Sequence, residues 1–371
     1  MPALHPGPIR AAAVRRILVI KWSAMGDLVS ATAFMEDVRS AFPEAAVDLN
    51  TLPAYAGLFR DDPRFARVIA PEVRREGWRG MLRWLTEVGA GGYDLIVDMQ
   101  SNDRSRFLLT LLVLSGRGGR WRVGHRARFP YHFGPGPDMA WDRPGIYTRS
   151  ALQAAGIPTA TPHGRLHVGE AQRARAAALM AESGLRAGRY VIFLPGSQKA
   201  GFLKRWGSGR YAELARLLAA QGVERIALVG GPDEVEDCRE IARLGGAAVV
   251  DLNGRSGIAE AVVLAEQARA IVGNDTGMAH VCACADMPML VICGATDPRR
   301  VRPIGPQVLA VQADIPCRNC YAKDCPEPDY QRCMKLLTPA WVAQALLQWE
   351  RGERRWQALE VPVLGYAGDE R

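Results

Sequence analysis

The chain has 371 residues, of which 48% are hydrophobic and 23% are charged. These values exclude a disordered chain, a fibrous repeat and a small disulfide-stapled scaffold, and the length predicts two domains. No apolar run approaches the roughly 18 residues that span a bilayer. The start of the chain has Pro and Arg where an export signal has an apolar segment, so we expect a cytoplasmic protein.

The chain carries 47 Lys and Arg against 39 Asp and Glu, a formal net charge of +8. This balance favours anionic partners such as phosphorylated metabolites or an anionic membrane face, although Arg-rich composition is also typical of high-GC genomes. The sequence has no zinc-finger, homeodomain or RNP-type pattern. We therefore expect no nucleic-acid partner.

The first half alternates strand-like and helix-like segments, which is typical of a parallel sheet with helices on both faces. Its first strand is a β-rich, mostly apolar run with no polar alternation, as in strands buried on both faces. The predicted strands are 16–22, 46–52, 93–99 and 122–125, and the predicted helices are 28–41 and a segment near 81–88. A Pro- and Thr-containing stretch at 158–164 is the predicted linker.

The alternation then restarts and predicts a second doubly wound domain. Its predicted strands are 190–194, 225–229, 247–252, 270–272 and 289–293, and its predicted helices are 171–183, 211–220, 234–244, 258–268 and 276–285. A last helix is predicted at 339–350, with a continuation to 359. We therefore predict a basic tail at 1–15, domains at 16–160 and 161–340, and a C-terminal helix with its tail at 341–371.

In open α/β sheets, ligands bind at the carboxyl ends of strands, so the residues after each strand are the candidates for function. The first such turn, Ser23-Ala24-Met25-Gly26-Asp27, places a carboxylate where a buried strand gives way to a helix. Asp27 is a candidate catalytic group on this ground. The alternative is that Asp27 only caps the helix, a role for which Asp is well suited.

Three later turns carry groups that could bind a ligand. The loop 194–206 contains Ser197 and Lys204, of which Lys204 suits a phosphate unless it is only a solvated loop charge. The segment 272–280 runs from a strand through Asp275, Thr276 and Gly277 to His280, and a helix start offers free N–H groups to a diphosphate. Glu234, after the strand 225–229, suits ribose hydroxyls or a helix cap.

Four cysteines are clustered on a loop, whereas Cys238, Cys282, Cys284 and Cys293 lie among apolar residues as ordinary core residues. The clustered thiols are Cys317, Cys320, Cys325 and Cys333. In a cytoplasmic protein this arrangement favours a metal over disulfides, and four thiolates suit Zn²⁺ or iron. Metal binding, reduced thiols and disulfides all remain open.

Taken in order, these segments resemble glycosyltransferase family 9, the ADP-heptose:lipopolysaccharide heptosyltransferases. The resemblance covers residues 16–342 and rests on S-x-M-G-D near the start, a G-S loop ending in K-R-W, G-G-x-x-E, G-N-D-T-G-x-x-H and the Cys-rich loop. The family has the GT-B fold, in which an acceptor domain and a nucleotide-sugar domain of Rossmann type face each other across a cleft. Its transfer inverts the anomeric centre and needs no catalytic metal.

The resemblance implies a role for each matching residue. Asp27 matches the catalytic base, Ser197 and Lys204 match donor-diphosphate contacts, and Glu234 matches a nucleoside contact. The donor loop would include Asp275, Thr276, Gly277 and His280, and the acceptor side would include Ser23, Met25 and Gly26. The last helix would cross back onto the first domain. No cofactor would be required for catalysis, and Zn²⁺ or iron would be structural.

We therefore expect heptose transfer from ADP-heptose to a lipopolysaccharide-core or related glycolipid acceptor. The enzyme would work at the cytoplasmic face of the inner membrane, in peripheral contact with anionic lipid. The helix after Asp27 and the loop 129–144 depart from the family pattern on the acceptor side. A family 9 transferase with another nucleotide sugar or acceptor is the first alternative. A non-catalytic nucleotide-sugar-binding scaffold and a nucleotide-sugar epimerase are the others.

Overall fold

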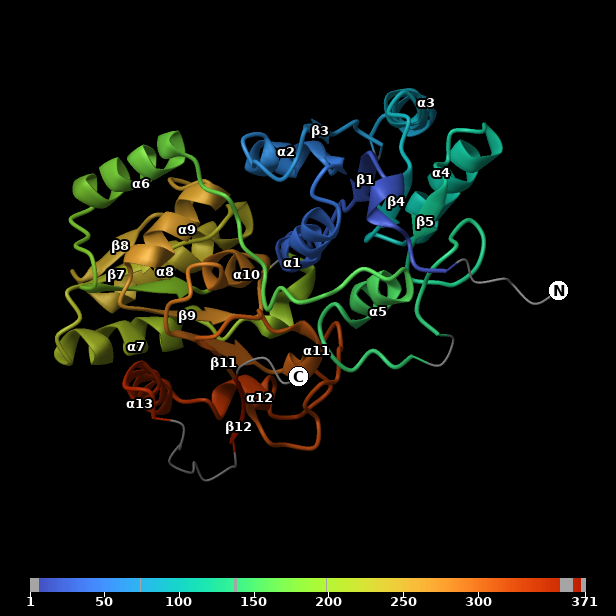
Figure 1. The fold of residues 1–371 in the computed structure, drawn as a ribbon. Coiled ribbons are helices and arrows are strands. Elements are labelled where there is room, and N and C mark those ends of the chain that lie inside the picture. Colours follow the sequence, from blue (N-terminus) through green and yellow to red (C-terminus); the bar gives the residue numbers. More distant parts are fainter. Residues whose placement is uncertain (1–6, 74, 137–138, 198, 354–362, 368–371) are drawn as a thin grey trace. The chain divides into compact units, whose positions relative to one another are not determined.

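The computed structural model describes residues 7–73, 75–136, 139–197, 199–353 and 363–367. The chain divides into two compact units, an N-terminal unit of Met1–His167 and a C-terminal unit of Val168–Arg371. Each unit is built around one sheet with helices on its faces (Figure 1). Parts of the predicted N-terminal tail (residues 1–6) and of the predicted C-terminal segment (354–362 and 368–371) lie outside the described residues.

The N-terminal unit contains a five-stranded parallel sheet in the order β3-β2-β1-β4-β5. Its strands are β1 (Arg16–Ile20), β2 (Ala46–Asn50), β3 (Arg67–Ile69), β4 (Leu95–Asp98) and β5 (Trp121–Val123). Its α-helices are α1 (Met25–Ala41), α2 (Pro53–Phe59), α3 (Gly77–Gly89), α4 (Asp103–Leu114) and α5 (Ile146–Ala154).

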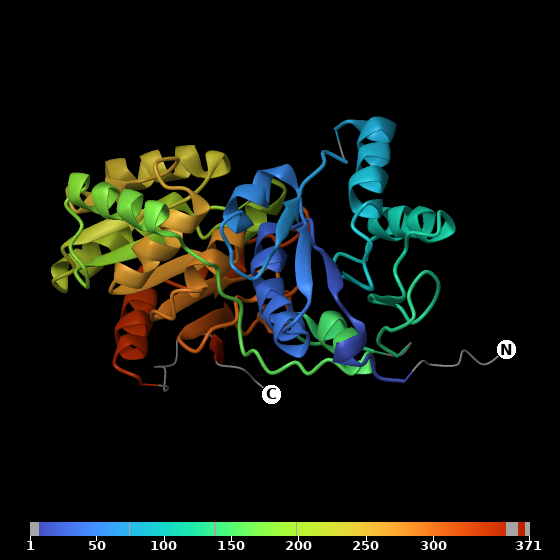
Figure 2. The same ribbon diagram turned by 45° about the horizontal axis from the view of Figure 1, so that its top comes forward.

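Helices cover both faces of this sheet, which is why its central strands β1 and β4 are apolar along most of their length. Residues 17–20 of β1 and all of β4 are buried. One face packs against Trp84 and Val88 of α3 and against Leu108, Leu109 and Leu112 of α4. In both ribbon views β1 and β4 lie between α1 and the pair α3 and α4 (Figures 1 and 2).

The C-terminal unit contains a seven-stranded sheet in the order β12-β11-β10-β9-β6-β7-β8, in which only β12 runs antiparallel to its neighbour. Its strands are β6 (Tyr190–Leu194), β7 (Arg225–Leu228), β8 (Val249–Asp251), β9 (Ala270–Asn274), β10 (Met289–Cys293), β11 (Val308–Ala313) and β12 (Val363–Ala367). Its α-helices are α6 (Glu170–Glu182), α7 (Ser208–Ala220), α8 (Val235–Gly245), α9 (Ile258–Gln267), α10 (Gly277–Ala283), α11 (Pro298–Val301), α12 (Arg332–Lys335) and α13 (Pro339–Glu350).

The core of the C-terminal unit includes the last helix of the described chain. Trp341, Val342 and Leu346 of α13 are buried in one cluster with Leu214 and Leu218 of α7 and with strand residues of the sheet. Helix α13 begins and ends where the sequence predicts, at 339 and 350. The predicted continuation to 359 reaches residues that are not described, and the crossing of this segment onto the first domain stays a prediction.

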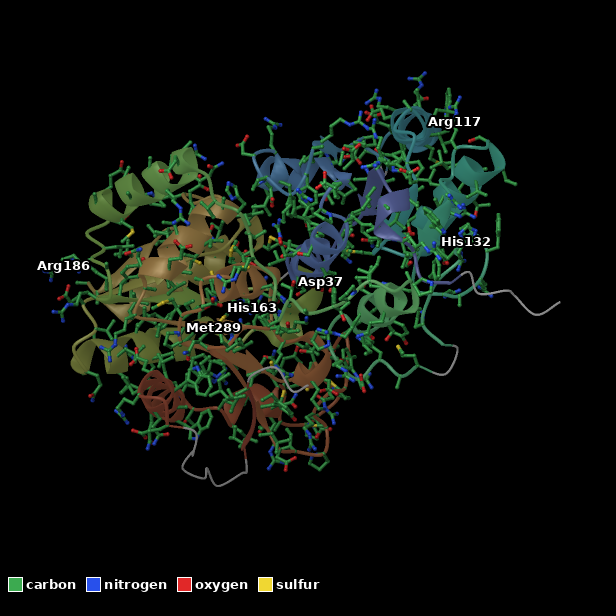
Figure 3. The ribbon with its side chains drawn as sticks, viewed as in Figure 1. Asp37, Arg117, His132, His163, Arg186 and Met289 are labelled. Atoms are coloured by element: carbon green, nitrogen blue, oxygen red, sulfur yellow. The ribbon has the colours of Figure 1, made fainter. Side chains whose placement is uncertain are left out.

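The predicted linker 158–164 is held along α1 rather than standing free. The carboxylate of Asp37 accepts hydrogen bonds from the amides of Ala160 and Thr161 at 3.1 and 2.9 Å. The same oxygen accepts from the Thr161 hydroxyl at 2.7 Å. Figure 3 labels Asp37 on α1 and His163 in this stretch. The division between the units falls after this stretch, at His167.

Both sheets have a switch point, where connections leave neighbouring strands toward opposite edges of the sheet. In the N-terminal unit it lies between β1 and β4, and in the C-terminal unit between β6 and β9. Ligands of doubly wound folds bind at such points, outside the carboxyl ends of the strands. The loops after β1, β4, β6 and β9 are therefore where a site is expected.

Candidate functional site

The turn after β1 carries Asp27 at the switch point of the N-terminal unit. Asp27 lies in the first turn of α1, is exposed, and accepts a hydrogen bond from the Ala24 amide at 3.3 Å. The capping role is therefore real, but it uses one lone pair of one carboxylate oxygen. The remaining acceptor capacity of Asp27 is open to a substrate hydroxyl.

Gln100, from the loop after β4, fixes the position of this turn. Its side-chain carbonyl accepts hydrogen bonds from the amides of Trp22 and Ser23 at 3.0 and 3.1 Å. The indole of Trp22 in turn donates to the buried side chain of Asn50 at 2.7 Å. The residues before Asp27 are thus anchored to two neighbouring strands, which orients the start of α1.

Lys21 lies directly after β1 and is only 8% exposed. Burial lowers its pKa, and the opposing charges of Asp27 and Asp98 act in the other direction. Within the described residues its ammonium group has no hydrogen bond or ion pair. A buried cation without a partner is costly, so its nearness to two carboxylates is what keeps a charge tolerable there.

Asp98, at the end of β4, is fully engaged and buried. Its carboxylate accepts from the amides of Gln100 and Ser101 at 3.0 and 2.8 Å, from Ser105 Oγ at 2.8 Å and from Tyr131 Oη at 2.6 Å. Burial raises its pKa, and these four hydrogen bonds oppose the shift. Asp98 therefore organises the loop after β4 and has little capacity left for a ligand.

His125 completes this edge of the sheet, after β5. Its Nε2 lies 2.9 Å from the Thr148 hydroxyl and its ring stacks on Tyr147, both on α5. Burial, assisted by the charge of Lys21, lowers the pKa of His125 to about 4, so the ring is neutral at pH 7. Lys21, Gln100 and His125 were not among the residues predicted from the sequence. Lys21 could have been found from the sequence, because a charged residue directly follows the apolar residues 17–20 of the first strand.

The loops after β6 and β9 meet at the switch point of the C-terminal unit. Lys204 Nζ forms an ion pair with Asp275 Oδ2 at 2.8 Å, and Thr296 Oγ1 donates to the same oxygen at 2.9 Å. The Lys204 side chain is 31% exposed, whereas that of Asp275 is 5% exposed. The structure therefore brings two of the predicted donor residues into direct contact.

A buried asparagine holds these two loops together. The amide nitrogen of Asn274 donates to the carbonyl oxygens of Pro195 and Gly196 at 2.5 and 3.3 Å. Its carbonyl oxygen accepts from the Trp206 amide at 3.3 Å and from Tyr211 Oη at 3.1 Å. Every hydrogen-bonding group of this fully buried side chain thus has a partner, which makes the loop rigid.

Ser197 and Glu234 lie beside this loop. The Ser197 hydroxyl donates to the carbonyl oxygen of Gly201 at 2.6 Å and is used to shape the loop itself. Glu234 accepts from the Gly231 amide at 2.6 Å, and burial raises its pKa. A Cβ at Gly196 would lie 1.6 Å from Glu234 Cγ, so a glycine is required there for Glu234 to reach the loop.

Thr276 caps the N-terminus of the short helix α10, where its hydroxyl accepts a hydrogen bond from the Met278 amide at 3.2 Å. Gly277 is the first residue of that helix. His280 lies on its last turn and is partly buried, and its carbonyl oxygen accepts from Cys284 Sγ at 3.5 Å. The helix has seven residues, and the effect of its dipole is confined to its first turn.

All four clustered thiols line one pocket, together with Leu203 and Gln331. Each of the four is a free cysteine, and burial followed by the neighbouring thiols raises the pKa of Cys333 to about 11. In the part of the chain that the structure describes, no three His, Cys, Asp or Glu side chains are grouped so as to hold a metal ion. The predicted thiol ligands thus share a pocket without forming a ligand set. The other four cysteines are buried, as predicted.

Comparison with known proteins assigns the chain to a family. The profile of "Glycosyltransferase family 9 (heptosyltransferase)" matches residues 81–331, more than half of the chain. The chain belongs to glycosyltransferase family 9. It is therefore a glycosyltransferase, as the sequence predicts.

The chain is 28% identical over 326 residues to lipopolysaccharide heptosyltransferase 1 of Pseudomonas aeruginosa, covering 84% of this chain and 87% of that protein. The solved structure of Escherichia coli ADP-heptose lipopolysaccharide heptosyltransferase II matches with a TM-score of 0.71 and 21% identity, covering 91% and 99% of the two chains. The E. coli heptosyltransferase WaaC, solved with ADP-2-deoxy-2-fluoro heptose, matches with a TM-score of 0.65 and 24% identity, covering 90% and 99%. The fold is thus GT-B, with two Rossmann-like α/β domains, as predicted.

Proposed function

We propose that this family 9 enzyme transfers a heptosyl residue from ADP-heptose to a lipopolysaccharide-core or related glycolipid acceptor, with inversion and with Asp27 as the general base. Support for the donor and acceptor comes from relatives named as lipopolysaccharide heptosyltransferases and from one solved with an ADP-heptose analogue. The observation that carries the proposal is the exposed carboxylate of Asp27 at a switch point, beside the buried ammonium of Lys21.

The base is proposed for a simple chemical reason. An acceptor hydroxyl is a poor nucleophile until its proton is taken as the new bond forms, and a positioned carboxylate accelerates such a step about 10²- to 10⁴-fold. In the proposed step the acceptor oxygen bonds to the anomeric carbon while Asp27 takes the hydroxyl proton. The bond from that carbon to the diphosphate oxygen breaks, and ADP leaves with its electron pair. Lys21 interacts electrostatically with Asp27, and a carboxylate is the chemical form that can accept a proton.

The leaving diphosphate gains charge, and we assign its stabilisation to Lys204. Its ammonium has three N–H donors, of which one is used by Asp275. The remaining donors are free to reach phosphate oxygens, while Asp275 and Thr296 hold the side chain in place. A fixed cation of this kind stabilises developing charge without reorganisation, so no divalent ion is required in the step.

The other predicted donor residues take supporting roles in the proposal. Glu234 reaches the loop after β6 and suits a hydroxyl of the nucleoside ribose. Ser197 shapes that loop, and Thr276, Gly277 and His280 of α10 are proposed as further donor contacts. Ser23, Met25 and Gly26 share the turn of Asp27 and are proposed for the acceptor side.

The donor is tested by comparing nucleotide sugars. ADP-heptose, UDP-sugars and GDP-sugars are each added to the protein, and the melting temperature is measured, since a ligand of the native state raises stability. Of these nucleotide sugars, we expect only ADP-heptose to raise the melting temperature. We also expect the protein to transfer heptose from ADP-heptose onto lipopolysaccharide isolated from a heptose-deficient strain. Transfer from another nucleotide sugar would support the first alternative. Binding without turnover for every donor would support a scaffold, and conversion of the free nucleotide sugar would support an epimerase.

A structural metal at the thiol pocket is proposed separately and has no part in the transfer step. Four soft donors on one pocket support Zn²⁺ or iron, although their present arrangement is not a ligand set. Elemental analysis of anaerobically purified protein decides the point. About one equivalent of Zn or Fe per chain supports the ion, and four reactive thiols without metal exclude it. We expect a chelator of divalent ions to leave transfer unchanged.

The proposed place of action is the cytoplasmic face of the inner membrane, in peripheral contact with anionic lipid. Within the described residues, no helix combines the length and the apolar character needed to cross a bilayer. The acceptor class is itself a glycolipid, so the enzyme must reach a membrane surface in some other way.

A further inference from the structure

Helices α3 and α4 expose apolar side chains on the surface that faces away from their sheet. In the described part of the chain nine large hydrophobic side chains are exposed, and four of them lie on these two helices. The four are Trp78, Leu82, Phe107 and Leu114, with exposed fractions of 65%, 53%, 50% and 73%. The outer side of a helix that covers a sheet is normally polar, so this concentration needs a physical explanation.

Apolar residues on the outer side of α4, two of them exposed and one half-buried, form a stripe. Phe107, Leu111 and Leu114 follow a spacing of four and then three, which places them on one face of the helix. That face is opposite the buried one, because Leu108, Leu109 and Leu112 pack against the sheet. Arg104 stands one turn before Phe107, and Arg117 follows the helix. Both are exposed, and neither has an ion pair within the described residues.

Helix α3 repeats the arrangement. Trp78 and Leu82 lie one turn apart on its exposed side, while Trp84 and Val88 are buried beneath it. The guanidinium of Arg79 lies 5.5 Å from the centre of the Trp78 ring. Arg83 is exposed one turn later and pairs with Glu76 at 3.1 Å. Tryptophan beside arginine is typical of surfaces that meet lipid headgroups.

The two helices are neighbours. A Cβ at Gly89, the last residue of α3, would lie 2.9 Å from the Arg117 side chain and 3.4 Å from that of Leu112. Both ribbon views show α3 beside α4, and Figure 3 labels Arg117 next to them. Residues 103–120 contain four arginines and one acidic residue. The exposed apolar stripe of α4 therefore lies in a basic environment.

We propose that the outer faces of α3 and α4 are the membrane-docking surface of this protein, with the anionic headgroup layer of a bilayer as its partner. Apolar side chains enter the boundary between headgroups and acyl chains, while arginines contact lipid phosphates. A second copy of the chain fits less well, because a two-fold interface through this face would place arginines against arginines. This inference rests on the proposed glycolipid acceptor and adds the surface that brings the enzyme to it.

The test measures binding of the purified full-length protein to vesicles, without donor or acceptor. Wild type is sedimented with vesicles of phosphatidylcholine alone and of phosphatidylcholine mixed with phosphatidylglycerol. We expect binding to the mixed vesicles only, weakened by salt. Phe107→Gln with Leu114→Gln should lower the partition coefficient about 10- to 100-fold. Arg104→Gln with Arg117→Gln should lower it roughly five-fold per arginine.

Matched controls lie in the C-terminal unit. Arg239→Gln on α8 and Tyr330→Ser remove an exposed cation and an exposed aromatic ring, and both should bind vesicles as wild type does. Far-ultraviolet circular dichroism and melting temperatures confirm that each variant is folded. Transfer onto a delipidated, water-soluble acceptor should be unchanged in the α4 variants, so loss of docking is distinguishable from failure of the proposed reaction.

Three results would overturn the proposal. The first is absence of binding by wild type to anionic vesicles. The second is equal binding by wild type and both α4 double variants. The third is a wild-type dimer in sedimentation velocity that the Phe107→Gln, Leu114→Gln variant loses, because the face would then be an interface between copies.

Discussion

At the C-terminal switch point the partly exposed cation Lys204 is held in an ion pair, whereas at the N-terminal switch point Lys21 and Asp27 keep hydrogen-bonding capacity that no described side chain uses. Lys204 is paired with Asp275, and Asn274 ties the surrounding loops together with four hydrogen bonds. Within the described residues, the Lys21 ammonium has no hydrogen bond or ion pair, and Asp27 accepts only the Ala24 amide. The first arrangement suits a site that binds a diphosphate without rearranging, and the second suits groups that must exchange a proton with a substrate.

In both units, the residues that hold the loops in place are different from the residues proposed for binding or catalysis. In each unit a buried polar residue is fully satisfied and organises its loop: Asp98 in the N-terminal unit and Asn274 in the C-terminal unit. Replacing such a residue should mainly affect stability. Replacing Asp27 or Lys204, which are more exposed, should mainly affect binding or turnover.

The largest expected loss of stability is that of Asn274→Ala. It leaves the buried amide of Trp206 and the carbonyl of Pro195 without partners, and each unsatisfied group costs about 1–3 kcal/mol. We expect the free energy of unfolding to fall by about 3 kcal/mol or more in urea titrations. The control Thr276→Ala removes only a helix cap and should cost about 1 kcal/mol. Equal stability of Asn274→Ala and wild type would show that the two loops are not held as described.

Lys204→Ala should weaken donor binding and lower turnover by about 10²-fold, because a charge that meets the leaving diphosphate is lost. Donor affinity is measured by calorimetry with ADP and turnover by release of ADP. Lys335→Ala removes an exposed cation that is paired with Asp329 outside the proposed site and should change neither value. A Lys204→Ala enzyme with wild-type donor affinity would contradict the phosphate contact.

The smallest expected effect concerns pH. The pKa of His125 is about 4 in the folded protein against an ordinary value of 6.5, so the unfolded chain binds more protons between these pH values. The stability that neutral His125 contributes is therefore present above pH 6.5 and is lost as the pH falls toward 4. His125→Gln keeps a hydrogen-bonding group near Thr148 and should remove about 1–2 kcal/mol of this acid sensitivity. Urea titrations of wild type and His125→Gln at several pH values from 7 to 4 give the free energy of unfolding at each pH. If this free energy fell equally with pH in the two proteins, the burial of a neutral His125 ring would be contradicted.

Elements with strong local patterns were predicted well from the sequence. Strands β6 and β10 begin and end at the predicted residues because each is a purely apolar run between turns. Strands β3, β11 and β12 were not predicted. Strand β3 has three residues and offers too short a pattern, and β12 includes Gly365 and pairs antiparallel with β11 at the edge of the sheet. The strand character of β3 and β12 comes from tertiary pairing rather than local sequence. Strand β11 is a buried, mostly apolar run (VLAVQA) whose pattern does favour a strand.

Some residues of the candidate site could be predicted from local sequence and others could not. Asp27, Lys204 and Asp275 could be found because each follows a strand within a short recognisable segment. Gln100 could not, since its partners Trp22 and Ser23 lie 78 and 77 residues away in the sequence. His125 had no local signal either, because its neutral state follows from burial against α5. Residues that position a site through distant contacts appear only when the strands are assembled.

The most direct test of the account is the rate of a single turnover by Asp27→Asn with saturating ADP-heptose and acceptor. The amide keeps the shape of the side chain but cannot take the hydroxyl proton. We expect unchanged affinity for ADP and a rate lower by about 10²- to 10⁴-fold. A wild-type rate in this variant would contradict the assignment of Asp27 as the general base.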